Sequence, residues 1–167
     1  MANRSAVRKK EYFSVCLRLL VVMKFLKLSL AALALSVLSP VLLAADGWRT
    51  DLQQAVNDAN KDGKHVLVEF TGSDWCPPCM FMSKEVFSKK SFISAASKDY
   101  VLVKLDFPRG NPGLAEKNQK WAEMFKVQGF PTVVLMNPDG KEVDRVVGVS
   151  HPSVEAFLKY LRSNLSS

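Results

Sequence analysis

The sequence predicts an α/β fold in which a central mixed β-sheet is flanked by helices on both faces. From residue 46 onward, apolar residues recur alternately at helical and at strand spacing, without repeats or low-complexity stretches. Early in this region two strand-like runs flank a helical one, an arrangement that makes the two strands parallel. The last two strand-like runs are joined by a short turn, which pairs them antiparallel. The 167 residues include 48% hydrophobic and 23% charged side chains, the composition of an ordinary globular protein.

The first half of this region predicts two helices and two strands. A helix that ends at Gly63 comes first, because apolar residues recur there at helical spacing: Leu52, Ala55, Val56 and Ala59. Residues 65–70, His-Val-Leu-Val-Glu-Phe, are rich in β-formers and predict a strand. A helix then runs through Phe87 to about residue 90 and resumes as far as residue 97. Residues 100–107 form an apolar run that predicts a buried strand.

The second half predicts a loop, two helices and a hairpin. Residues 108–113 are rich in Pro and Gly and predict the loop. The helix after it is marked by a set of apolar residues: Leu114, Trp121, Ala122 and Phe125. Residues 132–136 predict a strand, and the Asn-Pro-Asp-Gly turn at 137–140 leads into another at 141–147. The last helix carries an apolar stripe: Val154, Phe157, Leu158, Leu161 and Leu165.

Residues 1–45 have the features of an export leader. They contain seven Lys or Arg residues and one acidic residue, so the net charge of +7 belongs almost entirely to them. The remaining residues carry sixteen basic and fifteen acidic side chains, and we expect no nucleic-acid partner. Lys24 and Lys27 precede a modest apolar run at residues 28–43, which ends in two alanines. This pattern is typical of a secretory signal peptide.

The leader also predicts where the protein works. We expect Met23 to be the true start and cleavage to occur near Ala44 or Ala45, leaving residues 46–167 as the mature domain. The apolar run is short for a permanent membrane span, which needs about 20 residues. The mature domain is therefore expected to be periplasmic or secreted, and to be membrane-anchored if the leader stays uncleaved.

One pair of cysteines remains after cleavage. Cys16 lies in the leader, whereas Cys76 and Cys79 are separated by only two residues. A disulfide across so short a loop removes little chain entropy and would stabilise the fold only slightly. A structural disulfide framework in an exported protein would need more pairs. We therefore expect this pair to serve a chemical purpose.

The position of the pair indicates the chemistry. Cys76-Pro77-Pro78-Cys79 follows a predicted strand and opens a helix, the placement of a redox-active Cys-x-x-Cys motif. Free N–H groups at a helix N-terminus stabilise a thiolate, which is the form that attacks a disulfide. Cys76 is nearer the helix start and is the expected nucleophile, with Cys79 as the resolving cysteine. Prolines are tolerated in the first helical turn, and they stiffen the motif.

Three segments of the sequence resemble those of the thioredoxin superfamily. Residues 68–79 are similar to the family's strand that leads into Trp-Cys-x-x-Cys, and residues 129–132, Gly-Phe-Pro-Thr, are similar to its cis-proline loop. Asn-Pro-Asp-Gly-Lys at 137–141 resembles its hairpin turn. The resemblance covers residues 48–165 and implies a thioredoxin fold. The Thr-Gly-Ser-Asp-Trp-Cys form most resembles small exported thioredoxin-like proteins of bacteria.

The resemblance implies which side chains would contact a substrate. Pro131, in the cis form, would shape the substrate groove together with Phe130. The backbone beside Pro131 would be free to pair with an extended peptide. Trp75 would form an apolar wall beside the sulfur atoms.

The resemblance also implies a proton acceptor behind the second cysteine. Glu69 occupies the position where the family often keeps a buried acid, whose raised pKa would let it take the proton of Cys79. Lys104 matches a lysine that often neighbours this acid. The sequence departs from the family in having Glu rather than Asp, and one extra residue between Glu69 and Cys76. A solvated acid facing the edge of the sheet is the alternative interpretation of Glu69.

Other residues favour structural roles. A closed zinc site usually needs about four ligands. The mature chain adds only His65 and His151 to the cysteine pair, without finger-like spacing, so no metal site is expected. Both histidines are expected at the surface or at caps. Trp121 and Phe125 are expected to pack in the core.

These observations predict an extracytoplasmic thiol–disulfide oxidoreductase. Its substrates would be protein dithiols and disulfides, exchanged through a mixed disulfide without a bound cofactor. By resemblance, oxidising family members carry a histidine between the cysteines. The prolines found here supply no such donor, which favours a protein-disulfide reductase. A reductase in an oxidising compartment needs electrons, which a membrane partner would relay.

Two other functions remain open. One is a disulfide-forming oxidase or an isomerase. The lack of a second such domain and of a dimerisation extension disfavours the isomerase, and we expect a monomer. The other is a non-catalytic binding or chaperone module on the same fold, although such a scaffold has no need of both cysteines.

Overall fold

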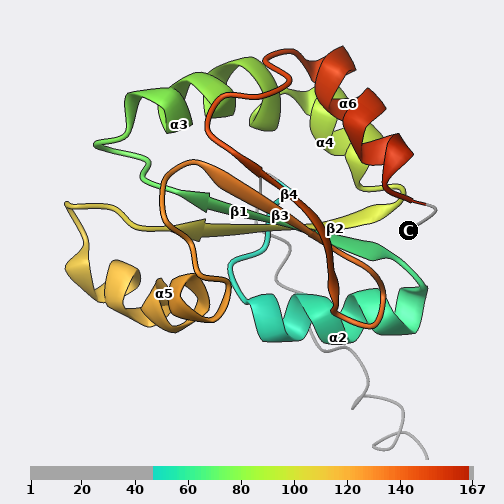
Figure 1. Ribbon diagram of the computed structural model, residues 1–167, viewed down its shortest axis with the longest axis horizontal. Helices are drawn as coiled ribbons and strands as arrows, with labels where there is room; N and C mark the ends of the chain where they lie inside the picture. Colours follow the sequence, from blue (N-terminus) through green and yellow to red (C-terminus); the bar gives the residue numbers. More distant parts are fainter. Residues whose placement is uncertain (1–46, 166–167) are drawn as a thin grey trace, which may run out of the picture. The chain divides into compact units, whose positions relative to one another are not determined.

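The computed structural model describes residues 47–165 (Figure 1). The expected leader, its start at Met23 and its cleavage site lie outside these residues. Within 47–165 no helix has the length and apolar character to cross a membrane. In chain order the elements are α2 (Leu52–Asp62), β1 (His65–Thr71), α3 (Pro77–Met82), the π-helical turn η1 (Ser83–Phe87), α4 (Lys90–Ala96), β2 (Tyr100–Asp106), α5 (Pro112–Met124), β3 (Thr132–Met136), β4 (Glu142–Val147) and α6 (Val154–Ser163).

The four strands form one mixed sheet in the order β2-β1-β3-β4. β1 and β2 are parallel, as expected for strands joined by a helical crossover, whereas β3 is antiparallel to both β1 and β4. Helices α3, α4 and α6 cover one face of the sheet, and α2 and α5 cover the other (Figure 1). This arrangement confirms the predicted fold class.

Strand β1 lies in the middle of the domain and is buried on both faces. Side chains alternate between the faces of a strand, so Leu67 and Glu69 point toward α3 while Val68 and Phe70 point toward α2 and α5. Every residue of β1 after His65 is buried. The chain leaves the carboxyl end of this strand directly into the cysteine motif, which places the motif on a rigid support.

An aromatic cluster fills the core beneath α3, α4 and α6. The rings of Phe87, Phe92 and Phe157 meet edge to face, with centroids 5.1 to 5.8 Å apart. Trp48 closes the cluster from the N-terminal side, and its indole N–H donates a hydrogen bond to the Phe87 carbonyl at 3.1 Å. A second apolar core lies on the other face of the sheet, beneath α2 and α5. The predicted core residues Trp121 and Phe125 are partly buried and pack against it.

The structure corrects two predicted boundaries. The loop expected at 108–113 is shorter, because the Asn111 side chain caps α5 and Pro112 takes a first-turn position, which suits proline. The helix expected after the cysteine motif continues to Phe87, but its second half is π-helical. In a π-helical turn, residues five positions apart lie on the same side of the helix. Met82 and Phe87 are five apart, and both are buried in the same core.

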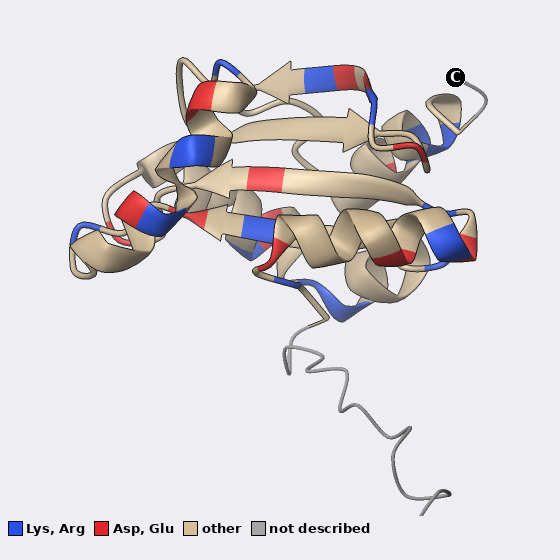
Figure 2. Cartoon of the chain, turned by 90° about the horizontal axis from the view of Figure 1, so that it is seen from below, with Lys and Arg blue, Asp and Glu red and all other residues tan. Residues whose placement is uncertain are grey.

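Basic and acidic residues are interspersed along the helices, strands and loops of the cartoon in Figure 2. The three lysines at the ends of α4, Lys89, Lys90 and Lys98, are all exposed.

Phe157→Ala is expected to lower the free energy of unfolding by about 3–5 kcal/mol, because the ring is fully buried and its removal leaves a cavity. Urea denaturation of the disulfide-intact protein measures this loss. Met124, which is 65% exposed on α5, provides the control, and Met124→Ala should change stability by less than about 0.5 kcal/mol. Equal effects of the two substitutions would contradict this account of the core.

Candidate active site

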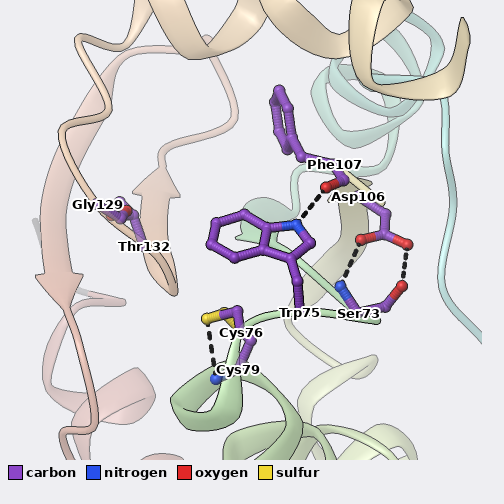
Figure 3. The surroundings of a disulfide bond; sticks show 8 residues. All are labelled: Ser73, Trp75, Cys76, Cys79, Asp106, Phe107, Gly129 and Thr132. Atoms are coloured by element: carbon purple, nitrogen blue, oxygen red, sulfur yellow. Dashed lines mark hydrogen bonds between the residues drawn. A yellow bond between two sulfur atoms is a disulfide. The ribbon is translucent and has the colours of Figure 1, made fainter. Parts of the chain in front are cut away.

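Cys76 and Cys79 are joined by a disulfide at the start of α3 (Figure 3), with their Cα atoms 5.2 Å apart. Cys76 is the N-cap residue of the helix, and its sulfur accepts a hydrogen bond from the Cys79 N–H at 3.4 Å. Cys79 is fully buried, whereas Cys76 keeps 4% of its surface exposed. A partner's sulfur atom can therefore reach Cys76 first.

The two prolines limit how many N–H groups face the Cys76 sulfur. Pro77 and Pro78 occupy the first turn of α3 and have no N–H to donate. The next N–H, that of Cys79, makes the one hydrogen bond to this sulfur within residues 47–165. The N–H of Met80 is used by the Cys76 carbonyl, at 3.0 Å. The helix start thus stabilises negative charge on Cys76, but through a single direct donor.

Trp75 forms an apolar wall beside the disulfide. Its indole N–H donates a hydrogen bond to the Phe107 carbonyl at 2.7 Å (Figure 3). The ring meets Phe130 edge to face, with centroids 5.6 Å apart, and Phe130 in turn lies 5.1 Å from the Phe107 ring. Gly72 leaves room for this packing, because a Cβ atom there would lie 2.5 Å from the indole.

The loop at residues 129–132 approaches the Trp75 indole from the side away from Asp106 and Ser73 (Figure 3). The Phe130–Pro131 peptide bond is cis. The Pro131 carbonyl accepts a hydrogen bond from the Gly148 N–H at 2.8 Å, and the Thr132 hydroxyl donates one to the Gly129 carbonyl at 2.7 Å. Phe130 makes no backbone hydrogen bond within residues 47–165, so its N–H and carbonyl are available to a partner.

Three consecutive residues tie the cysteine motif to the last residue of β2 and the segment that follows it; we call Ser73, Asp74 and Trp75 the latch. The N–H and hydroxyl of Ser73 donate to the two carboxylate oxygens of Asp106, at 2.9 and 2.6 Å. The two oxygens of Asp74 accept from the N–H groups of Arg109 and Gly110, at 2.9 and 2.8 Å. Trp75 completes the latch through Phe107. The backbone hydrogen bonds to Asp74 lower the pKa of its carboxyl below the ordinary value.

Glu69 is fully buried, so the interpretation of this residue as a solvated acid is wrong. It lies on β1 directly opposite Lys104 of β2. Burial raises the pKa of Glu69 to about 7, although the charge of Lys104 and the Thr71 hydroxyl partly oppose the shift. Neither carboxyl oxygen has a hydrogen-bond partner of standard geometry within residues 47–165. Its protonated and charged forms are therefore balanced near neutral pH.

A pocket of about 200 Å³ connects Glu69 with the resolving cysteine. This volume has room for several water molecules, each of which needs about 30 Å³ in the liquid. Its lining combines the buried acid, the buried sulfur and two lysines: Glu69, Thr71, Ser73, Cys79, Met80, Ser83, Lys84 and Lys104. Glu69 and Cys79 thus line the same pocket.

The histidines take no part in this site. His65 packs beside Tyr100 at the start of β1, and the His151 ring stacks on Tyr160 with centroids 4.7 Å apart. Across residues 47–165 no three His, Cys, Asp or Glu side chains come together as metal ligands.

The latch was not predicted from the sequence, nor was the hydrogen bond from the Arg109 N–H to Asp74. The extra residue between Glu69 and Cys76 was the available signal, because Ser73 and Asp74 lie in that longer segment.

Comparisons with known proteins agree with this geometry. The model of the thioredoxin-like domain family matches residues 52–163. The chain is 30% identical over 129 residues to the disulfide bond reductase DsbH of Chlamydia pneumoniae, covering 75% of this chain and 76% of that relative. It is 31% identical over 127 residues to the thioredoxin-related protein DsbJ of the same organism, covering 70% of this chain but 36% of DsbJ.

Among solved structures, a DsbH oxidoreductase superposes with a TM-score of 0.61 at 28% identity, covering 71% of this chain and 83% of that chain. The thioredoxin-like fold is thus shared with these relatives. The chain belongs to the thioredoxin-like domain family and is a thiol–disulfide oxidoreductase with Cys76 and Cys79 as its redox pair.

Proposed function

We propose that the protein is an extracytoplasmic reductase of protein disulfides. The direction of electron transfer is inferred from one observation. Within residues 47–165 the Cys76 sulfur has a single N–H donor, since Pro77 and Pro78 provide none. A strongly oxidising pair is one whose reduced form is stabilised. Weak stabilisation of the Cys76 thiolate favours the disulfide instead, so the reduced pair passes its electrons on readily.

Two further observations support the proposal. The relative DsbH is named a disulfide bond reductase. The leader pattern of residues 1–45 supports export. In an oxidising compartment, the disulfide of a reductase must be reduced again by an electron donor after each reaction. We propose a membrane protein as the electron donor, acting on the same two cysteines.

The reaction has two exchange steps. The Cys76 thiolate attacks one sulfur of the partner's disulfide, so that a mixed disulfide forms and the partner's second sulfur leaves as a thiolate that takes up a proton. Cys79 then loses its proton and attacks the Cys76 sulfur, which releases the partner's first sulfur. The partner gains two electrons and two protons, and the Cys76–Cys79 disulfide forms.

Glu69 is the proposed acceptor of the Cys79 proton. It lines the same pocket as Cys79, and its pKa of about 7 allows it to take a proton and return it near neutral pH. Trp75, Phe130 and Pro131 would hold the partner beside Cys76. The free N–H and carbonyl of Phe130 would pair with the partner's extended backbone.

Cys79→Ser is expected to accumulate a mixed disulfide with a disulfide-bonded model protein, because the first exchange proceeds and the second is blocked. In the mature domain, Cys76→Ser is the matched variant and should form none, since Cys79 is the one cysteine left there and is fully buried. Non-reducing electrophoresis followed by peptide mass spectrometry identifies the trapped cysteine. If Cys76→Ser retains the whole function of the wild-type protein, the chain is a binding module and the proposal fails.

Glu69→Gln tests the buried carboxyl through the pH dependence of stability. The pKa of Glu69 is raised from 4.5 to about 7 on folding, so the folded state holds its proton more tightly than the unfolded state. The stability contributed by this proton is complete below about pH 4.5 and is lost as pH rises to about 7, a loss of about 3 kcal/mol. Urea denaturation of the oxidised protein at several pH values should show that loss in the wild type and not in Glu69→Gln.

The exposed acid Glu116 supplies the control, and Glu116→Gln should keep the wild-type pH profile. The same Glu69→Gln protein should also release the mixed disulfide more slowly near pH 7, because Cys79 loses its proton acceptor. Unchanged release, together with a pH profile like that of the wild type, would remove Glu69 from the mechanism.

A further inference from the structure

Arg109 places a positive charge on the apolar wall of the active site. Its guanidinium lies over the Trp75 ring, 5.0 Å from the ring centroid, and the residue is exposed. The attraction between a cation and the face of an indole holds the guanidinium at this position. The indole itself is fixed by its hydrogen bond to Phe107.

The latch fixes the backbone from which Arg109 projects. Both oxygens of Asp74 are used by the N–H groups of Arg109 and Gly110. Gly110 fits closely against this carboxylate, because a Cβ atom there would lie 3.2 Å from an Asp74 oxygen. Asp74 thus holds the loop by its backbone, and no ion pair joins it to the guanidinium.

The N–H groups of the Arg109 guanidinium are therefore available to a ligand. Within residues 47–165 no carboxylate lies within ion-pair distance of it. The pocket that contains Glu69 and Cys79 is lined by two further cations, Lys84 and Lys104. The acids near the cysteine motif do not bind the guanidinium. Asp106 accepts hydrogen bonds from Ser73, and Glu69 is fully buried.

We infer that Arg109 is a specificity-determining residue, which binds an acidic side chain next to the reacting cysteine of the partner. A planar guanidinium forms paired hydrogen bonds with a carboxylate, and a fixed one loses little freedom on binding. Asp74 acts as a positioning residue that keeps Arg109 over Trp75. The inference rests on the proposed reductase function and adds the chemical class of partner that the same site prefers.

Competition between two peptides tests the inference. Each peptide is closed by one disulfide, and the two differ only in having Glu or Gln next to the first cysteine. The reduced full chain is mixed with each peptide at low salt, and the rate is divided by the rate with dithiothreitol to remove differences in intrinsic reactivity. The normalised Glu-to-Gln ratio should be about two to five for the wild type, as for an exposed ion pair, and should shrink in high salt.

Variants of two arginines show whether Arg109 is the cause. Arg109→Gln should bring the ratio to about one, and Arg109→Glu should bring it below one. Arg162→Gln removes an exposed arginine from α6 and should keep the wild-type ratio. Asp74→Glu keeps the negative charge near Arg109 but lengthens the side chain that binds the Arg109 and Gly110 N–H groups, so it should lower the ratio although Arg109 is still present. A general structural defect would slow both peptides equally and leave the ratio unchanged.

The outcomes separate the inference from the proposed function. A wild-type ratio of one overturns the inference, and so does a ratio that survives Arg109→Gln. An equal loss of rate on both peptides in Arg109→Gln also overturns it, because Arg109 would then act on Cys76 rather than on the partner. A wild type that reduces neither peptide contradicts the reductase function itself.

Discussion

The active site depends on the position of Cys76 at the N-cap of α3. There the sulfur faces the first N–H that the helix has available, that of Cys79, and this contact stabilises the thiolate that starts the exchange. The rest of the domain keeps this position in place. β1 delivers the chain from the centre of the sheet, and the core under α3 anchors the helix through residues such as Met82 and Phe87.

The latch extends this support to the surface that meets a partner. Residues 73–75 form no helix or strand, yet each is hydrogen-bonded to the end of β2 or to the segment that follows it. Trp75 is therefore held by the same network that fixes the Arg109 backbone. The cysteine motif and the proposed recognition residue Arg109 thus lie on two segments that are hydrogen-bonded to each other, which preserves their spacing when a partner binds.

The buried Glu69 is the main departure from an apolar core. A carboxyl with no hydrogen-bond partner in the described domain destabilises the folded state, and its neutralisation near pH 7 limits that cost. Lys104 opposes the shift from the neighbouring strand. Groups that reduce stability in this way are concentrated at functional sites, and Glu69 shares its pocket with the resolving cysteine.

Apolar periodicity and two short motifs were sufficient to predict the mixed sheet, the helices on both faces and the redox pair. They did not establish the environment of Glu69. A strand that is buried on both faces shows no alternation of polar and apolar residues, so the pattern does not reveal whether a single charged residue in it is buried. The latch could not be predicted from sequence periodicity either, since Ser73 and Asp106 are hydrogen-bonded to each other but lie 33 positions apart in the chain. The early start of α5 followed from Asn111 and Pro112, two residues that suit a helix cap as well as a loop.

The equilibrium reduction potential of the Cys76–Cys79 pair tests the account most directly. The purified protein is equilibrated in glutathione buffers of graded ratio, and the reduced fraction is read by thiol alkylation and mass spectrometry. With a single N–H donor at the Cys76 sulfur, we predict a potential near that of thioredoxin, about −270 mV. A potential near about −120 mV, that of a strong oxidant, would contradict the account and assign the protein to disulfide formation.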